Sequence, residues 1–170
     1  DVDVLGERAL GAFYAGRNPV LPPAVGVVQN IFENCKLKIE NCSIAVIGLG
    51  FLIGKPVSVW FMDKAKEVML LNKFSDLSLI KNADVVIIGV GKAGLIKPEM
   101  LKEGAGVIDF GYSMTQISAD KKMTISGDFD SQLPATSYQL LNFYTPTPGG
   151  TGPILVAKLF ENFYGLNGEK

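Results

Sequence analysis

Residues 43–56 constrain the fold more than any other part of this sequence. They read Ser-Ile-Ala-Val-Ile, then Gly-x-Gly-x-x-x-Gly, then Lys-Pro at the start of a helix-like segment. A buried strand, a glycine turn and a helix in this order are typical of a βαβ unit that binds a dinucleotide. Gly48 permits the tight turn, Gly50 lets a pyrophosphate approach the backbone, and Gly54 lets the helix lie close to the sheet. The N–H groups at the helix start are then expected to face the phosphates.

Short apolar runs recur along the chain with helix-like stretches between them, which is the pattern of βαβ units that build a parallel sheet. The runs are rich in Val, Ile and Leu without strict alternation, as expected for strands covered on both faces. We therefore predict an α/β fold, Rossmann-like, with a doubly wound, mainly parallel sheet and flanking helices. The predicted strands are 43–47, 68–71, 84–90, 106–110 and 140–144, and 123–126 is a candidate edge strand.

The two ends of the chain read differently from the middle. Residues 1–16 are irregular to helical, 19–23 form a Pro-rich link, and 24–35 have the periodicity of an amphipathic helix. Residues 153–164 are apolar enough for a docking helix. We read residues 1–170 as one domain whose ends pack on something outside this chain. The first residue is Asp1 and not Met, which suggests a fragment or a processed product.

Composition narrows the classes of partner and chemistry. The 16 basic and 17 acidic residues nearly cancel, so we expect small-molecule partners, no nucleic acid and no membrane surface. We find no bilayer-length apolar run and no signal peptide, and predict a cytoplasmic protein. The lack of histidine excludes imidazole-based hydrolases and His-ligated metals, and we expect no metal. Cys35 and Cys42 fit no redox or zinc spacing and are read as buried structural thiols.

The end of the second predicted strand should contact the adenosine ribose of the cofactor. An Asp or Glu there would bond the hydroxyl pair of NAD, but this chain has Asn72 and Lys73. Lys73 fits two roles, a point charge for the 2′-phosphate of NADP or a solvated loop lysine. The sequence therefore favours NADP as the cofactor and leaves NAD as the alternative.

Several motifs, in order, resemble one family, the bifunctional methylenetetrahydrofolate dehydrogenase/cyclohydrolases. Asp-Val-Asp at 1–3 looks like the entry to the family's cofactor domain, and 48–56 is similar to its Gly-Arg-Ser…Val-Gly-Lys-Pro turn. Residues 107–111 and 127–130 look like two further signatures. The stretch Thr-Pro-Thr-Pro-Gly-Gly-Thr-Gly-Pro at 145–153 is similar to the family's Thr-Pro-Val-Pro-Gly-Gly-Val-Gly-Pro. The resemblance covers nearly the whole chain but only the family's cofactor domain.

The resemblance implies oxidation of 5,10-methylenetetrahydrofolate by a nicotinamide cofactor, followed by hydrolysis of the methenyl product to 10-formyltetrahydrofolate. It implies tetrahydrofolate derivatives as ligands and a homodimer. It also implies that the essential lysine and its tyrosine partner belong to an N-terminal catalytic domain absent from this chain. We therefore assign no catalytic residue here, and expect 1–35 and 150–170 to be linking helices that pack on that domain.

The resemblance also implies site residues, position by position. Asp109 and Asp128 are read as mainly structural or supporting residues, since an Asp at a strand end commonly caps a loop. The substrate-binding residues are Asp3, at the mouth of the folate pocket, with Pro148, Gly149, Gly150 and Gly152. The cofactor-binding residues are Gly48, Leu49, Gly50, Ile53, Gly54, Lys55, Pro56, Asn72, Lys73, Val90 and Gly91.

This chain departs from the family's pattern where a 2′-phosphate is usually met. Leu49 and Gly50 replace the family's Arg and Ser, and Asn72 and Lys73 match its His-Ser pair, so among these four only Lys73 offers a charge. The departures leave room for a noncatalytic dinucleotide-sensing module or a degenerate homologue. An S-adenosylmethionine-dependent methyltransferase also places glycines after its first strand, but it has no use for residues 148–153.

Overall fold

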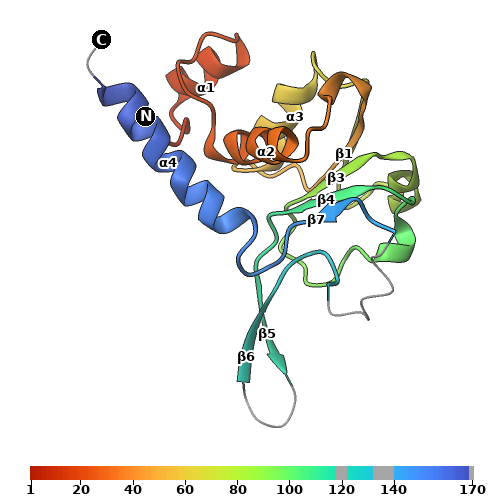
Figure 1. Ribbon diagram of the computed structural model, residues 1–170. Helices are drawn as coiled ribbons and strands as arrows, with labels where there is room; N and C mark the ends of the chain where they lie inside the picture. Colours follow the sequence, from red (N-terminus) through yellow and green to blue (C-terminus); the bar gives the residue numbers. More distant parts are fainter. Residues whose placement is uncertain (118–121, 132–139, 169–170) are drawn as a thin grey trace.

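A five-stranded parallel sheet forms the centre of the computed structural model, which describes residues 1–117, 122–131 and 140–168 (Figure 1). The strand order is β2-β1-β3-β4-β7, and every neighbouring pair is parallel. The predicted α/β class with a parallel sheet is thus confirmed. The strands are β1 (Ser43–Ile47), β2 (Glu67–Leu71), β3 (Val85–Ile88), β4 (Gly106–Asp109) and β7 (Phe143–Tyr144).

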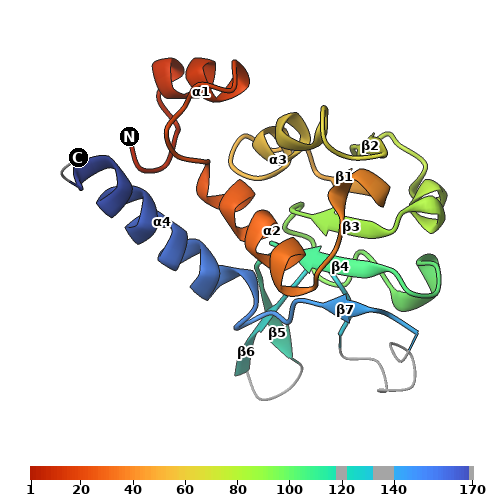
Figure 2. The same ribbon diagram turned by 45° about the horizontal axis from the view of Figure 1, so that its top comes forward.

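Helices gather over one face of this sheet and along its side, as Figures 1 and 2 show. They are α1 (Glu7–Tyr14), α2 (Pro23–Asn34), α3 (Gly54–Phe61) and α4 (Thr151–Asn167). Helices α2 and α3 lie on the sheet, and α4 runs beside α2. None of the helices in the described ranges combines the length and the apolar character that a membrane span needs.

The core has two halves, one on each face of the sheet, because alternate strand residues point in opposite directions. Ile44 and Val46 belong to the half that includes α2 and α3, whereas Ala45 and Ile47 belong to the other half. This explains why β1 is buried along its whole length. Within the described residues, the short 3-10 helices η2 (Leu77–Asn82) and η3 (Pro98–Met100) cover part of the second face with Ile80 and Met100, and connecting segments supply the rest.

A separate antiparallel hairpin projects from the body of the molecule (Figure 1). Its strands are β5 (Ser113–Ile117) and β6 (Lys122–Ser126), which pair only with each other within the described residues. The candidate edge strand at 123–126 is thus a strand, but its partner within the described residues is β5 and not the main sheet. The segment pairs with β5, whose sequence carries no strong apolar signal, and β5 itself was not predicted.

The strand predicted at 140–144 is reduced to its last two residues. The residues before it are not in a strand, but they still contact the residue that precedes β4: the N–H of Asn142 donates to the carbonyl of Ala105 at 2.9 Å. The ring of Phe143 lies against Gly106, where a side chain would collide with it. Strand β1 has the predicted bounds, and β2, β3 and β4 differ from the predicted strands by one to three terminal residues.

The two ends of the described chain meet on α4. Asn162 is buried, and its side-chain amide donates to the carbonyl oxygens of Val2 and Leu21, each at 2.8 Å.

Both cysteines are free thiols, and burial raises the pKa of Cys35 and of Cys42. This agrees with a structural role for the thiols, because a reactive cysteine needs a lowered pKa.

Candidate functional site

A cavity of about 550 Å³ lies at the carboxyl ends of three neighbouring strands. Strand β1 lies between β2 and β3 in the sheet. The chain first adds β2 on one side of β1 and then adds β3 on the other side, so the strand order reverses at β1. Ligands of open α/β sheets bind at such a reversal. The lining residues are Ile47, Gly48, Leu49 and Gly50 after β1, Asn72, Lys73, Ser75 and Leu77 after β2, and Gly89, Val90, Lys92 and Leu95 after β3.

The structure brings together six of the eleven predicted cofactor residues in this one cavity: Gly48, Leu49, Gly50, Asn72, Lys73 and Val90. Gly91 belongs to the same loop as Val90. Sequence reasoning missed Ser75, Leu77, Lys92 and Leu95. An apolar or basic residue in a loop carries no signal of its own, and only the strand order shows that these loops meet.

Close packing at the glycine turn joins β1 to α3. Gly48 has φ 86°, and its N–H donates to the carbonyl of Leu71, at the end of β2, at 3.0 Å. A side chain on Gly54 would collide with the carbonyl oxygen of Gly48. A side chain on Gly50, in contrast, would meet nothing within 4 Å. The protein's own packing thus explains Gly48 and Gly54, while Gly50 leaves its backbone open to a ligand.

The start of α3 contributes less to the cavity than the sequence suggests. The N–H of Lys55 donates to the carbonyl of Gly50 at 2.9 Å, and Pro56 has no N–H to offer. The side chain of Ile53 packs against Gly89 and the core. Lys55 and Pro56 line a different cavity of about 370 Å³, beside α1. The turn after β1, and not the first turn of the helix, therefore forms the floor of the candidate site.

The lining of the cavity is basic. Lys73 and Lys92 line it, and none of its described lining residues carries a carboxylate. The ammonium of Lys73 lies 4.8 Å above the ring of Phe74. The Asn72 side-chain oxygen accepts the N–H of Phe74 at 2.9 Å, and the Ser75 hydroxyl oxygen accepts the N–H of Asn72 at 3.0 Å. Asn72 and Ser75 therefore shape this loop, and the two lysines favour an anionic group in the cavity.

The predicted substrate residues near the chain's end form a turn between β7 and α4. The peptide bond between Thr147 and Pro148 is cis, and Gly149 has φ 98°. A side chain on Gly150 would collide with the carbonyl oxygen of Pro146. The turn itself thus explains both glycines. Gly152, in the first turn of α4, is exposed and would meet nothing within 4 Å, so the fold leaves room beside it.

Asp3 does not lie in this turn. Its neighbour Val2 contacts Asn162, which is eleven residues beyond Thr151 and so about 16 Å along α4 from the turn. Asp1, and not Asp3, accepts the nearby backbone N–H groups, those of Leu5 and Gly6, at 3.0 and 2.7 Å. The described residues thus present the predicted substrate set as two separate groups.

Two buried carboxylates stand behind these loops. Asp128 is fully buried, and its carboxylate accepts the N–H groups of residues 90, 91 and 92. Asp109 is 1% exposed at the end of β4, and its carboxylate accepts the N–H groups of Gly111 and Phe129 at 2.7 and 2.9 Å. Burial, with a smaller contribution from the charge of Asp128, raises the pKa of Asp109 to about 6. Both side chains cap loops, as expected.

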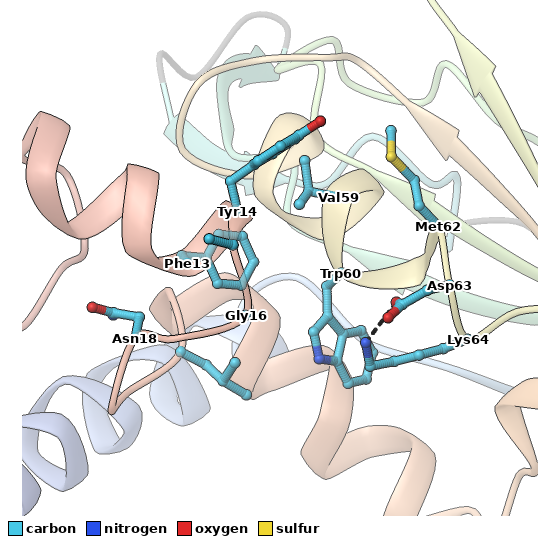
Figure 3. A pocket seen from close by; sticks show the side chains of 11 residues that line it. Phe13, Tyr14, Gly16, Asn18, Val59, Trp60, Met62, Asp63 and Lys64 are labelled. Carbon is cyan, nitrogen blue, oxygen red and sulfur yellow. Dashed lines mark hydrogen bonds and ion pairs between the residues drawn. The ribbon is translucent and has the colours of Figure 1, made fainter.

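A second cavity, of about 560 Å³, lies between the carboxyl ends of α1 and α3, with residues after each helix also lining it (Figure 3). Phe13 and Tyr14 line it from one side, and Trp60 from the other. The ammonium of Lys64 lies 5.8 Å from the Trp60 ring centre and pairs with Asp63 at 2.7 Å. This cavity shares no lining residue with the one at the strand ends, so the two are separate sites.

A parallel sheet with a reversal of strand order, and a glycine turn on the floor of the cavity at that reversal, define a nucleotide-binding domain of the Rossmann class. Residues 22–169 match the family model for the tetrahydrofolate dehydrogenase/cyclohydrolase, NAD(P)-binding domain. The chain belongs to this family.

Curated relatives agree with this assignment. The chain is 32% identical over 164 residues to the bifunctional protein FolD of Caldanaerobacter subterraneus, a match that covers 95% of this chain and 55% of the relative. It is 34% identical over 164 residues to the FolD protein of Helicobacter pylori, covering 95% of this chain and 54% of that protein. The chain thus spans about half the length of the curated relatives it matches.

Solved structures share the fold over almost the whole chain. The methylenetetrahydrofolate dehydrogenase-cyclohydrolase of Trypanosoma brucei, solved with NADP and an inhibitor, superimposes with a TM-score of 0.86 at 25% identity, covering 98% of this chain and 57% of that one. The Campylobacter jejuni enzyme gives a TM-score of 0.82 at 26% identity, covering 98% of this chain and 58% of that one.

Proposed function

We propose that this chain is the cofactor domain of an enzyme that oxidises 5,10-methylenetetrahydrofolate with NAD(P) and hydrolyses the methenyl product to 10-formyltetrahydrofolate. The cavity over the glycine turn supports the proposal most strongly, in a chain of the tetrahydrofolate dehydrogenase/cyclohydrolase family. In this proposal the bound nicotinamide accepts the hydride. The part of this chain is to hold the dinucleotide and to shape one wall of the folate site.

The cavity residues fit a dinucleotide. The open backbone at Gly50 suits the pyrophosphate, and apolar side chains such as Leu77 and Leu95 suit the adenine ring. We propose NADP as the cofactor, because Lys73 and Lys92 line the cavity and no carboxylate among the described lining residues could bond the ribose hydroxyl pair of NAD. The NADP complex of the Trypanosoma brucei protein supports the same choice.

We place the folate at the wall formed by Pro148, Gly149, Gly150 and Gly152, with Asp3 farther along α4. A carboxylate accepts hydrogen bonds from the donor edge of a pterin, and the absence of side chains at 149, 150 and 152 lets a flat ring approach the backbone. The proton transfers of the hydrolytic step need a group that reaches the bridging carbon. In our proposal a lysine and a tyrosine in another domain supply it. Residues 1–35 and 150–170 pack on that domain through the surfaces that this chain leaves exposed, since α2 already buries one face in the core of this chain.

Titration of this chain with NADPH and NADH, followed by fluorescence, tests the binding part of the proposal. We expect saturable binding with a preference for NADPH, and weaker binding in Gly50→Val. Lack of binding of either dinucleotide would contradict it. A cofactor-sensing module would also bind, so the catalytic part needs the longer protein, assayed by the absorbance of methenyltetrahydrofolate. Turnover by this chain alone at the rate of the longer protein would show that the catalytic groups lie within these 170 residues.

We also propose a homodimer and a cytoplasmic location. Strand β2 is an edge of the sheet in the described residues, with a neighbour on one side only, and Leu70 on it is 41% exposed. Such an edge can pair with the same strand of a second copy. Light scattering would give twice the chain's mass, and Leu70→Lys would shift it toward the monomer.

A further inference from the structure

The loop after β3 is held by a single buried side chain. The carboxylate of Asp128 accepts the N–H groups of Val90, Gly91 and Lys92 at 2.7, 2.9 and 2.6 Å. Val90 and Lys92 line the cofactor cavity. Because three N–H groups of consecutive residues point at one carboxylate, the path of this loop depends on Asp128.

The turn between β7 and α4 is held at both ends by one residue at the end of β4. The N–H of Asp109 donates to the hydroxyl oxygen of Thr145 at 2.8 Å, and the Asp109 carbonyl accepts the hydroxyl of Thr151 at 2.8 Å. Pro148, Gly149 and Gly150 lie between these two threonines. The position of Asp109 therefore sets where the turn begins and where it ends.

Each of the two aspartates contacts the chain segment that carries the other one. The Asp109 carboxylate accepts the N–H of Phe129, the residue directly after Asp128. A side chain on Gly127 would collide with the Asp109 carboxylate, and a side chain on Gly111 would collide with the Asp128 carboxylate. A shift of one segment must therefore move the other, since no free space separates them.

We propose that Asp128 and Asp109 are positioning residues that couple the loop at 90–92 to the turn at 145–151, so that a dinucleotide bound at the first also orders the second. The identity of the two ligands rests on the proposed function, but the coupling between the loops does not. Coupling of this kind is reciprocal, so a ligand on the turn also strengthens binding of the dinucleotide.

The free-energy cost of burying the two carboxylates of Asp109 and Asp128 supports their role as positioning residues. Burial of a carboxylate opposes its ionisation, and the neighbouring charge of Asp128 adds to the effect at Asp109, whose pKa rises to about 6. Asp128 is the charged side chain that acts on Asp109. A fully apolar junction would avoid this cost, but it would leave the five backbone N–H groups that the two carboxylates accept without partners.

Asp84 offers a matched control at the opposite end of the same sheet. Its carboxylate also accepts a backbone N–H, that of Ser43 at 2.7 Å, and pairs with Lys102. It contacts neither of the two loops. Replacement of Asp84 by Asn thus removes a carboxylate that caps a strand start and leaves the proposed coupling in place.

Amide hydrogen exchange of this chain, with and without NADPH, tests the coupling. In the parent, NADPH should slow exchange both at 90–92 and at 145–151. In Asp128→Asn and Asp109→Asn we expect the effect at 145–151 to disappear and NADPH affinity to fall by about tenfold, the loss expected from one or two hydrogen bonds to a charged group. Asp84→Asn should keep both effects.

A milder pair of variants covers the case in which an aspartate variant does not fold. Thr151→Val keeps the shape of the side chain but cannot donate to Asp109, so exchange at 145–151 should rise and the NADPH effect there should weaken. Thr151→Ser should restore both. Amides of β1 report in the same data whether the sheet is intact.

The outcomes separate the two proposals. If the parent binds neither NADPH nor NADH, the proposed function fails, and faster exchange at 145–151 in Asp128→Asn without ligand still supports the coupling. If the parent binds NADPH and the aspartate and Thr151→Val variants transmit protection to 145–151 as the parent does, the coupling is overturned and the proposed function stands.

Discussion

The α-carbon of Gly54 lies directly against the carbonyl oxygen of Gly48, with no room for a methyl group between them. At this point the residue after β1 and the first residue of α3 touch through their backbone atoms. This contact fixes the height of the helix above the sheet and so the shape of the glycine turn that lines the cavity.

The first prediction concerns stability at this contact. Gly54→Ala should lower the free energy of unfolding by about 1–3 kcal/mol, because overpacking forces backbone shifts. Gly50→Ala is the matched control, since its methyl group would enter open space, and it should stay within about 0.5 kcal/mol of the parent. Urea denaturation measures both. Equal unfolding midpoints for the two variants would show that α3 can move away from β1 at little cost.

The second prediction separates binding from stability at Gly50. Gly50→Val should leave the urea midpoint nearly unchanged, because nothing lies within 4 Å of the position of the added β-carbon. It should weaken NADPH binding, since the branched side chain occupies the space where the pyrophosphate approaches the backbone. Calorimetric titration gives the affinity. Equal affinity in the variant and the parent would remove the phosphate role from this turn.

The third prediction concerns the choice between NADP and NAD. Leu49→Arg should favour NADP by about 1–3 kcal/mol, the range of a charge-assisted hydrogen bond. Lys73→Ala should shift the preference the other way, because it removes one of the two lysines in the cavity. The ratio of the two dissociation constants is the measurement. If neither change moves that ratio, the adenosine end of the cofactor lies elsewhere.

The fourth prediction is a pH dependence of stability that comes from Asp109. Its pKa rises from 3.8 to about 6 on folding, so between these values the folded state binds the proton more tightly than the unfolded state. The resulting stabilisation, about 3 kcal/mol, is present below pH 4 and is lost as the pH rises through 6.

Comparison with Asp109→Asn isolates this effect, because the amide does not titrate. The free energy of unfolding of the parent, relative to the variant, should fall between pH 4 and pH 7 and stay level above that. A constant difference over this range would mean that Asp109 is ionised throughout, with a pKa close to that of an exposed carboxyl group.

Local signals were enough to predict the central part of the fold. Strand β1 has the predicted bounds, and Gly48 and Gly54 take the conformational roles expected of them. These features depend on residues within a few positions of each other. The hairpin was missed for the opposite reason: Met114, an apolar residue of β5, is 61% exposed, so an apolar side chain in this segment does not mark a buried strand.

The candidate site was predictable only where it is built from the glycine turn. Leu77 and Leu95 reach the cavity because β2 and β3 flank β1, and the sequence shows this order only indirectly. Asp109 and Asp128 were recognised as strand-end residues, but their contact was not. The hairpin between them returns the chain to the end of β4, and that return brings residues 19 positions apart together.

The hydrogen bonds of Asn162 bear on the order in which the chain can fold during synthesis. They join α4 to Val2 and Leu21, which are 160 and 141 residues earlier in the sequence. Contacts at such separations form only after the whole domain has left the ribosome. Until then, the side of α2 that α4 covers, including Gly26 beside Lys158, faces water. A nascent chain stalled before α4 is therefore expected to bind chaperones or aggregate, whereas one that reaches α4 closes both ends in a single late step.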